Sequence, residues 1–335
     1  MPARPAMFSV AVILAIYKPD AQRLERQLEC LFAQEDVAIE VFAVLDRAGD
    51  EGAAQPPVLH RYPLRLIEPP HHLGARGAFA AGLAAALAAG GTEDRLFAYC
   101  DQDDVWHPRK LAETASALRG ANAALAHCDA RVVRADGSVV SPSLHRFERR
   151  EEAADLLDAI LLNSVTGMTA VFTAATARLA VKLMDGLPSA VLHDHVTAVA
   201  AMAMGPVVRV PQPLVDYVQH GENVLGASVP PLPHWWQRSF VLKDVRAYRQ
   251  TSARVFEDRR TIAAALQREG IALGPMAEMF RLPPRVSSLR LLMLYTLAFW
   301  SRMLDGRPRR AMWCWRLGDA ALFGATASGA LEKTA

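Results

Sequence analysis

The sequence has few cysteines, four in 335 residues, and no two of them form a C-x-x-C pair. This excludes a small scaffold held together by disulfides, and free thiols in a reducing compartment are expected. The start of the chain also lacks the long apolar region of a signal peptide. We therefore expect a cytoplasmic protein.

An excess of one charge is missing as well. Lys and Arg number 37 and Asp and Glu 35, which gives a net charge of +2. This balance argues against a nucleic-acid partner. Hydrophobic residues make up 52% of the chain and charged residues 21%, as in a globular protein with a sizeable core.

No apolar run is long enough to span a membrane. The strongest, 289–300, is interrupted by Arg290 and is shorter than the ~20 residues that a spanning helix needs. Arginines surround it, and Trp300 lies at its end. Two interpretations stay open: an ordinary amphipathic helix packed on the protein, or a basic peripheral surface on anionic lipid at the cytoplasmic face of the inner membrane.

Two nucleotide-binding motifs are absent. No G-x-G-x-x-G follows the first apolar run, which weighs against an NAD-dependent dehydrogenase. No G-x-x-x-x-G-K-[ST] occurs either, which weighs against a P-loop NTPase.

What the sequence does contain is a regular alternation of strand and helix patterns. This alternation predicts an α/β fold with a mostly parallel sheet flanked by helices. Asp136-Gly137 predicts a hairpin turn, and Pro230-Pro231-Leu232-Pro233 predicts a linker. The predicted strands are 8–16, 39–45, 64–67, 96–100, 123–133, 207–210 and 213–218; the predicted helices are 24–32, 77–89, 151–162, 174–184 and 193–204.

The linker divides the predicted organisation into two regions. Residues 1–229 would form one domain, with a nucleotide-binding half at 8–118 and an acceptor-binding half at 119–229. Residues 230–335 would form a helical appendage, because their pattern is helical almost to the end.

Three carboxylates, Asp101, Asp103 and Asp104, directly follow the predicted strand 96–100. This is the carboxyl end of a strand, where open α/β sheets bind their ligands. Clustered carboxylates repel one another unless a cation lies between them, and oxygen ligands of this kind suit Mg²⁺ or Mn²⁺. The alternative is an acidic turn that caps the next helix.

Three more residues are candidates for the same chemistry. Asp46 follows the second predicted strand and could accept a hydrogen bond from a base or a ribose, or it could be a turn residue. Asp194 starts a predicted helix and is either a helix cap or a general base. His220 lies in a polar loop, where a surface histidine is as plausible as a metal ligand.

The order of these motifs resembles a known family. An apolar strand ending in A-I-Y-K is followed by G-A-R-G, D-Q-D-D-V-W-H-P-R-K-L, N-S-V-T-G-M-T, L-H-D-H and Y-V-Q-H-G-E-N-V-L-G-A. Over residues 8–227 the chain is similar to family 2 glycosyltransferases of the GT-A fold, and most similar to the bacterial rhamnosyltransferase-type members.

The resemblance implies a role for each matching residue. Asp103 and Asp101 would bind the divalent metal, Mn²⁺ or Mg²⁺, and His220 would add a contact to it. Asp194 would be the catalytic base of an inverting enzyme. The remaining implied contacts are, for the nucleotide sugar, Ala15, Tyr17, Asp46, Arg76, Asp101, Gln102 and Asp103, with Lys110 as a weaker candidate, and, for the acceptor, Asn163, Thr166, Gly167, His193, Asp104 and Trp106.

The implied reaction is transfer of a sugar from a dTDP- or UDP-linked donor to a saccharide or lipid-linked saccharide. Rhamnose is the first choice of sugar, and polysaccharide or lipopolysaccharide O-antigen synthesis of the cell envelope is the implied pathway. Galactose, glucose or GlcNAc are alternative sugars. A nucleotide-sugar-binding protein without activity and a nucleotidyltransferase remain competing hypotheses.

The sequence departs from the family pattern at several positions. Asp46 is followed by R-A-G-D instead of a D-G-S-type turn, Lys18 stands where asparagine is usual, and Val218 stands where many relatives have arginine. These departures leave the choice of base open. The acids themselves are present.

Overall fold

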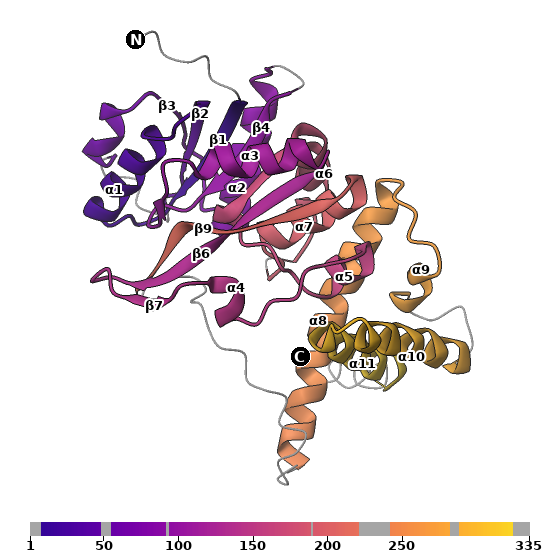
Figure 1. Ribbon diagram of the computed structural model, residues 1–335. Helices are drawn as coiled ribbons and strands as arrows, with labels where there is room; N and C mark the ends of the chain where they lie inside the picture. Colours follow the sequence, from indigo (N-terminus) through magenta and orange to yellow (C-terminus); the bar gives the residue numbers. More distant parts are fainter. Residues whose placement is uncertain are drawn as a thin grey trace. The chain divides into compact units, whose positions relative to one another are not determined.

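The computed structural model describes residues 8–47, 55–91, 94–188, 190–220, 242–281 and 288–323. Within them the chain forms two compact units (Figure 1). The first contains the described parts of 1–150, 165–185 and 192–229, and the second those of 151–164, 186–191 and 230–335. The sequence predicts only 230–335 for the second region, whereas the second unit also contains the described parts of 151–164 and 186–191.

One sheet with the strand order β3-β2-β1-β4-β8-β6-β9-β5 organises the first unit, and β7 pairs with β6 at its side. Neighbours from β3 to β4 are parallel, as are β6 and β9, and β8 is antiparallel to both β4 and β6. The predicted α/β class is confirmed. The strands are β1 (Phe8–Ile16), β2 (Val37–Leu45), β3 (Leu64–Ile67), β4 (Leu96–Cys100), β5 (Val105–Trp106), β6 (Leu125–Arg134), β7 (Val139–Ser141), β8 (Ala170–Thr173) and β9 (Val207–Gln219).

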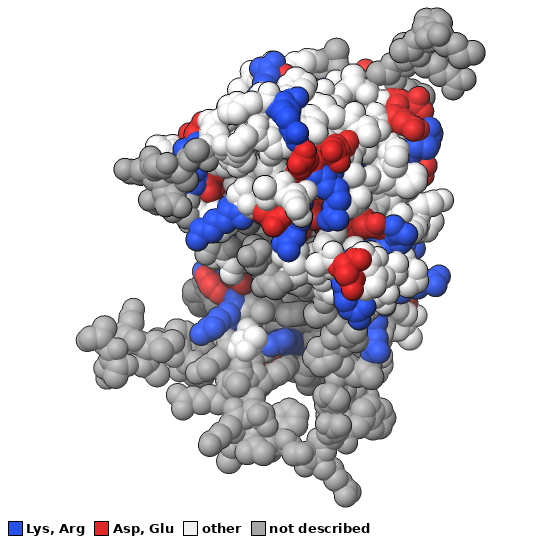
Figure 2. All heavy atoms as spheres, turned by 90° about the vertical axis from the view of Figure 1, so that its left-hand side faces the viewer, with Lys and Arg blue, Asp and Glu red and all other residues white. Residues whose placement is uncertain are grey.

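Helices cover both faces of this sheet. They are α1 (Ala21–Phe32), α2 (Gly74–Ala88), α3 (Lys110–Gly120), α4 (Leu144–Phe147), α6 (Ala174–Met184) and α7 (His193–Met204), with short 3₁₀ turns η1 (Pro57–Arg61) and η2 (Gly167–Thr169). On the face drawn in Figure 2, acidic and basic side chains alternate over a largely uncharged surface.

The apolar run of β1 is buried because helices pack on both of its faces. Alternate residues of a strand point to opposite faces. Val12 and Leu14 belong to the core cluster that also contains Leu28 of α1 and Leu111 of α3. On the other face, α2 approaches so closely that a Cβ on Gly82 would lie 2.5 Å from Ile13 Cγ2. Helices α6 and α7 pack with α2 on this side (Figure 1).

Two predicted elements differ from the structure. The predicted helix 151–162 is reduced to α5 (Leu156–Leu161), because the side chain of Asp155 accepts a hydrogen bond from the Asp158 amide and starts the helix there. The two short strands predicted at 207–210 and 213–218 are one strand, β9, whose register against β6 shifts at Pro213.

The second unit is helical. It contains α5, α8 (Leu242–Arg268), α9 (Met276–Met279), α10 (Ser288–Leu304) and α11 (Pro308–Phe323). The buried carboxylate of Asp158 on α5 accepts a hydrogen bond from Arg302 Nε of α10 at 2.6 Å and also pairs with Arg307. These ion pairs attach the short segment 151–164 to the C-terminal helices. Among the described helices, none is both long and apolar enough to cross a bilayer.

Candidate active site

The acidic turn lies where the sequence predicted it, at the carboxyl end of β4. Leu96–Cys100 is buried throughout as a central strand, and the chain then leaves the sheet through Asp101, Gln102, Asp103 and Asp104. Asp101 and Asp103 are partly exposed. The turn therefore presents carboxylates at the edge where parallel α/β sheets bind ligands.

Gln102 joins this turn to the end of β1. Its side-chain Oε1 accepts a hydrogen bond from the Tyr17 amide at 2.8 Å, and its Nε2 donates to the Tyr17 carbonyl at 2.9 Å. Two residues 85 positions apart are thus held together by a reciprocal pair. The ring of Tyr17 is 39% exposed and lies 5.0 Å from the His72 ring, centre to centre. Ala15, also predicted for the nucleotide site, is the next to last residue of β1 and is partly buried.

His220 contacts Asp103. Its Nε2 lies 2.7 Å from Asp103 Oδ2, and the exposed fractions of the two side chains are 6% and 17%. The long strand β9 makes this contact possible, because its far end runs beside β5 just after the acidic turn. The sequence predicted both residues as metal ligands, and the structure brings them together.

Asp194 acts on the same cluster. It lies in the first turn of α7, where a negative charge is favoured by the helix dipole. Burial, and then the charges of Asp103 and Asp194, raise the pKa of Asp101 to about 7. Three carboxylates from two separate elements therefore share one electrostatic environment.

The donor set suits a divalent cation. Carboxylate oxygens and an imidazole nitrogen are ligands that Mn²⁺ accepts, and a cation would relieve the mutual repulsion of Asp101 and Asp103. Among the described residues, no group of three or more His, Cys, Asp or Glu side chains is already arranged as a metal cage. Metals of this class often take further ligands from substrate phosphates, so two or three protein ligands are sufficient.

Comparison with known families decides which fold family this site belongs to. The model of glycosyl transferase family 2 matches residues 11–177, about half of the chain. This segment belongs to glycosyl transferase family 2. The matched segment includes the acidic turn and ends before Asp194 and His220. A comparison with curated proteins gives no match.

Two solved structures are similar to this chain over most of its length. The Staphylococcus aureus protein TarS, residues 1–349 in complex with UDP, is 13% identical with a TM-score of 0.51, covering 95% of this chain and 92% of that one. A mannosyltransferase from Pyrobaculum calidifontis in complex with GDP-Man and Mn²⁺ is 17% identical with a TM-score of 0.43, covering 96% and 90%. At 13% identity the likeness to TarS concerns the GT-A-type fold alone, and the mannosyltransferase, with a TM-score below 0.5, supports no conclusion.

Asp46 has a structural task in the family 2 segment. Its carboxylate is 3% exposed and accepts hydrogen bonds from the amides of Leu73 and Gly74, both at 2.9 Å. It therefore fixes the start of α2, whose first turn carries Arg76. Burial lowers the pKa of the Arg76 guanidinium, which is partly exposed. Nucleotide contacts by both residues stay predictions.

Two residues of the acidic turn region do not fit the acceptor role predicted for them. Asp104 and Trp106 are only 1% and 2% exposed, so neither side chain presents a surface to a saccharide. Lys110 is fully buried, with its Nζ 3.7 Å from the centre of the Trp106 ring, and does not reach a phosphate. Their spacing in the motif reflects packing beneath the turn, which a linear pattern does not distinguish from binding.

The predicted acceptor residue His193 is also buried. Its ring stacks on Phe79 at 3.8 Å, and a Cβ on Gly167 would lie 2.6 Å from its Nε2. Neither ring nitrogen of His193 has solvent exposure or a hydrogen-bond partner among the described residues, so its ring packs against Gly167 and presents no polar atom to an acceptor. The acceptor role of Gly167 stays a prediction. Burial lowers the pKa of His193 to about 3, and the ring is neutral at pH 7.

The other two predicted acceptor residues lie in different units. Thr166, in the first unit, accepts a hydrogen bond at its Oγ1 from Arg150 at 2.6 Å. Asn163 belongs to the second unit. The acceptor role of both stays a prediction.

The sequence did not predict the hydrogen-bond link between β4 and α7 behind the site. The Tyr99 hydroxyl of β4 lies 2.9 Å from Thr197 Oγ1 of α7, and the Thr197 hydroxyl donates to the His193 carbonyl at 2.8 Å. The only sequence signal was the position of Thr197, four residues after His193 and so on the same side of the helix.

Proposed function

We propose that this chain is an inverting glycosyltransferase that moves a sugar from a nucleoside diphosphate sugar to a hydroxyl group of a saccharide. The observation that carries this proposal is the contact of His220 with Asp103 beside Asp101, with the charge of Asp194 acting on the same carboxylate. A diphosphate-binding end and a proton acceptor in one environment are what the reaction needs.

Asp194 is the proposed general base. It takes the proton of the acceptor hydroxyl while the hydroxyl oxygen forms a bond to the anomeric carbon. The bond from that carbon to the diphosphate oxygen breaks in the same step, the diphosphate keeps the electron pair, and the configuration of the sugar inverts. Asp101, Asp103 and His220 would hold Mn²⁺ or Mg²⁺, which when bound would neutralise charge on the leaving diphosphate.

The donor side of the site supports a nucleotide. The predicted nucleotide contacts lie on neighbouring elements. They are the end of β1, Asp46 directly after the parallel neighbour β2, and Arg76 in the first turn of α2. We infer a dTDP- or UDP-linked donor, with dTDP-rhamnose as the first candidate and galactose, glucose or GlcNAc donors as alternatives. A few side chains decide such a choice, so the sugar is a matter for experiment.

The proposed acceptor is a growing cell-envelope saccharide, such as an O-antigen chain on a lipid carrier. A cytoplasmic enzyme would reach such an acceptor at the inner face of the membrane. The exposed apolar side of α10, which includes Leu297 and Trp300, supports a peripheral contact of this kind.

A nucleotide-sugar-binding protein without activity is the competing function. It would need the carboxylates that hold the metal for the diphosphate but no base, and the presence of Asp194, whose charge acts on Asp101, favours the enzyme.

Thermal unfolding with a panel of nucleoside diphosphates and their sugars, with and without Mn²⁺, tests the donor class. Ligands that bind the folded state raise the melting temperature by mass action. We expect a metal-dependent rise with dTDP or UDP compounds that is lost in Asp103→Ala and kept in the exposed control Asp185→Ala. A chain that responds to none of the nucleotides would contradict the proposal.

A further inference from the structure

The carboxylate of Asp46 is enclosed, although the sequence predicts that it contacts a base or a ribose. Its Oδ1 accepts a hydrogen bond from the Leu73 amide and its Oδ2 accepts one from the Gly74 amide. His72 Nδ1 lies 3.0 Å from the same Oδ2. The Asp46 side chain is buried, whereas the His72 side chain is 46% exposed. Both carboxylate oxygens are therefore occupied within the chain, and His72 is the polar side chain of this contact that a ligand can reach.

The contact with Asp46 determines which nitrogen of the His72 ring carries the hydrogen. A carboxylate oxygen accepts hydrogen bonds, so at 3.0 Å it repels a lone pair on Nδ1 and attracts a hydrogen there. In the neutral ring the hydrogen therefore belongs to Nδ1, and Nε2 keeps its lone pair. Among the described residues, no hydrogen bond occupies Nε2. His72 thus offers a hydrogen-bond acceptor next to the predicted nucleotide site.

Tyr17 adds an aromatic surface beside this acceptor. Its ring lies 5.0 Å from the His72 ring, centre to centre, at an angle of 31° between the ring planes, and Tyr17 is 39% exposed. The two hydrogen bonds of Gln102 to the Tyr17 backbone connect this ring pair to the acidic turn. Exposed aromatic rings stack on every kind of nucleobase with little preference. The choice between bases then depends on polar atoms such as His72 Nε2.

An acceptor on the protein favours a base that offers a hydrogen. Uracil and thymine carry a hydrogen on N3, and guanine carries one on N1, whereas N3 of cytosine has a lone pair. A pyrimidine with the N3 hydrogen can donate to Nε2, but cytosine would place two lone pairs against each other. A site built for a hydrogen bond rejects such a ligand because both polar atoms lose their partners.

We propose that His72 is a specificity-determining residue of the donor site: its Nε2 accepts the N3 hydrogen of uracil or thymine. Asp46 is then a positioning residue that acts through His72, because it fixes the hydrogen of the ring on Nδ1. This inference rests on the proposed function. It explains how Asp46 can influence the choice of base although its own carboxylate is enclosed.

Titration of the full chain with UDP, dTDP and CDP, each with Mn²⁺, tests the role of His72. The measurements are made at about pH 8 to keep imidazole neutral. We expect the unmodified chain to bind UDP and dTDP at least about tenfold more tightly than CDP. His72→Phe keeps an aromatic ring without the acceptor, so the preference should fall to about 1–3-fold through weaker binding of UDP and dTDP. The exposed control His60→Phe should keep the full preference.

The ratio of affinities separates recognition of the base from a general loss of structure, which would weaken all three nucleotides equally. The same ratio tests Asp46. Asp46→Asn should lower the preference in the unmodified chain, and it should have no further effect on the preference of His72→Phe, because the residue that it positions is already gone. If His72→Phe does not fold, His72→Leu replaces it.

An unmodified chain that binds CDP as tightly as UDP would overturn the role of His72. A preference that His72→Phe leaves unchanged would do the same, while nucleotide binding itself would still support the proposed function. A chain that binds none of the three nucleotides would contradict the proposed function and this inference with it. Equal effects of Asp46→Asn with and without His72 would overturn the positioning role of Asp46 alone.

Discussion

His193 and Asp194 are adjacent in the H-D-H segment but have different environments, because α7 begins there. Successive residues of a helix are rotated by about 100° from one another. His193 points into the core, where it stacks on Phe79, and Asp194 remains partly exposed beside the acidic turn. Burial, more than residue type, decides which polar residue of a motif can act on a substrate.

Gly167→Ala tests the packing around His193. The new Cβ would lie 2.6 Å from His193 Nε2, and both residues are buried, so one of them must move. We expect a loss of about 1–3 kcal/mol in the free energy of unfolding, measured by chemical denaturation. The control is Gly120→Ala, whose Cβ would meet no atom within 4 Å. Equal stability of the two variants would contradict the packing of His193 described here.

At the residue scale, the sequence located the acidic turn from its polarity and its position after a buried strand. Asp103 and His220 are each predicted as metal ligands, and the structure places them in contact, while their metal role stays a prediction. Prediction failed for Trp106 and His193, because a motif does not reveal that a polar or aromatic side chain packs beneath the surface that its neighbours form. The nucleotide role of Asp46 stays a prediction.

At the scale of elements, a buried hydrogen-bond chain links β4 to α7 and thus the acidic turn to the proposed base. Thr197 Oγ1 donates to the His193 carbonyl, so Tyr99 must donate to Thr197. Tyr99 is fully buried, and among the described residues its hydroxyl has no other hydrogen-bond partner. The distance between the two elements therefore depends on this contact.

Thr197→Val tests this link. Valine has the shape of threonine but leaves the buried Tyr99 hydroxyl without its acceptor, which costs about 1–3 kcal/mol of unfolding free energy. Thr197→Ser keeps the acceptor and should retain most of the stability. In the double variant Tyr99→Phe/Thr197→Val the unpaired hydroxyl is gone, and stability should recover in part. Chemical denaturation of the three proteins measures this, and identical values for Val and Ser would contradict the account.

Local patterns predicted most elements of the first unit. The apolar runs of β1 and β4 and the turn at Gly137, whose φ is 83°, lie where expected. The helix predicted at 151–162 was too long, because Asp155 starts α5 late. That α5 joins the second unit depends on Arg302 and Asp158, 144 positions apart, and pairs so distant leave no periodic signal.

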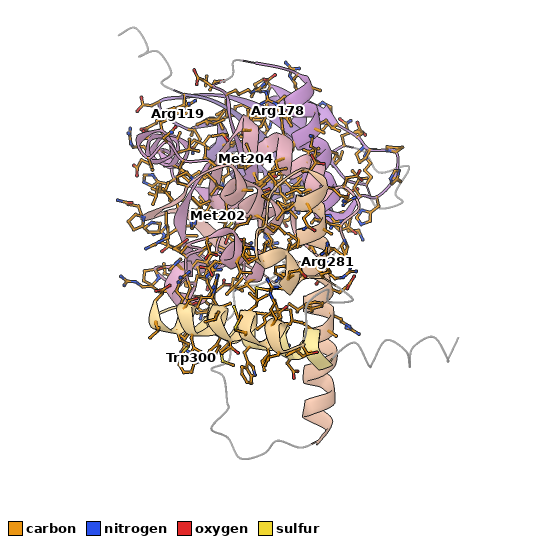
Figure 3. The ribbon with its side chains drawn as sticks, turned by 90° about the vertical axis from the view of Figure 1, so that its right-hand side faces the viewer. Arg119, Arg178, Met202, Met204, Arg281 and Trp300 are labelled. Atoms are coloured by element: carbon orange, nitrogen blue, oxygen red, sulfur yellow. The ribbon has the colours of Figure 1, made fainter. Side chains whose placement is uncertain are left out.

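The exposed surface of the second unit matters for the protein as a whole. Leu291 and Tyr295 of α10 are buried, while Met293, Leu297 and Trp300 on its other side are 53%, 60% and 56% exposed. Figure 3 shows Trp300 projecting from α10. A helix that is apolar on both sides needs an apolar partner on each. The proposed acceptor is lipid-linked, so the anionic membrane that carries it would be the partner for this exposed side of α10.

Flotation of the full chain with vesicles of neutral and anionic phospholipid tests this contact. Met293→Glu should reduce the bound fraction about tenfold, because a charge enters the apolar face. Met204→Glu is the matched control, since Met204 is a methionine exposed to 47% in the first unit. Binding that Met293→Glu leaves unchanged would contradict the proposal, as would a stable dimer that this substitution dissociates.

Sugar transfer by Asp194→Asn is the most direct test of the central claim. Nucleoside diphosphate release is followed with a panel of nucleotide sugars, Mn²⁺ and saccharide acceptors. The account predicts that the variant loses about 10²–10⁴-fold in turnover, since its amide cannot take the acceptor proton, and that nucleotides still stabilise it against heat. The exposed Asp185→Asn should transfer normally. Full transfer by a folded Asp194→Asn protein would contradict the account.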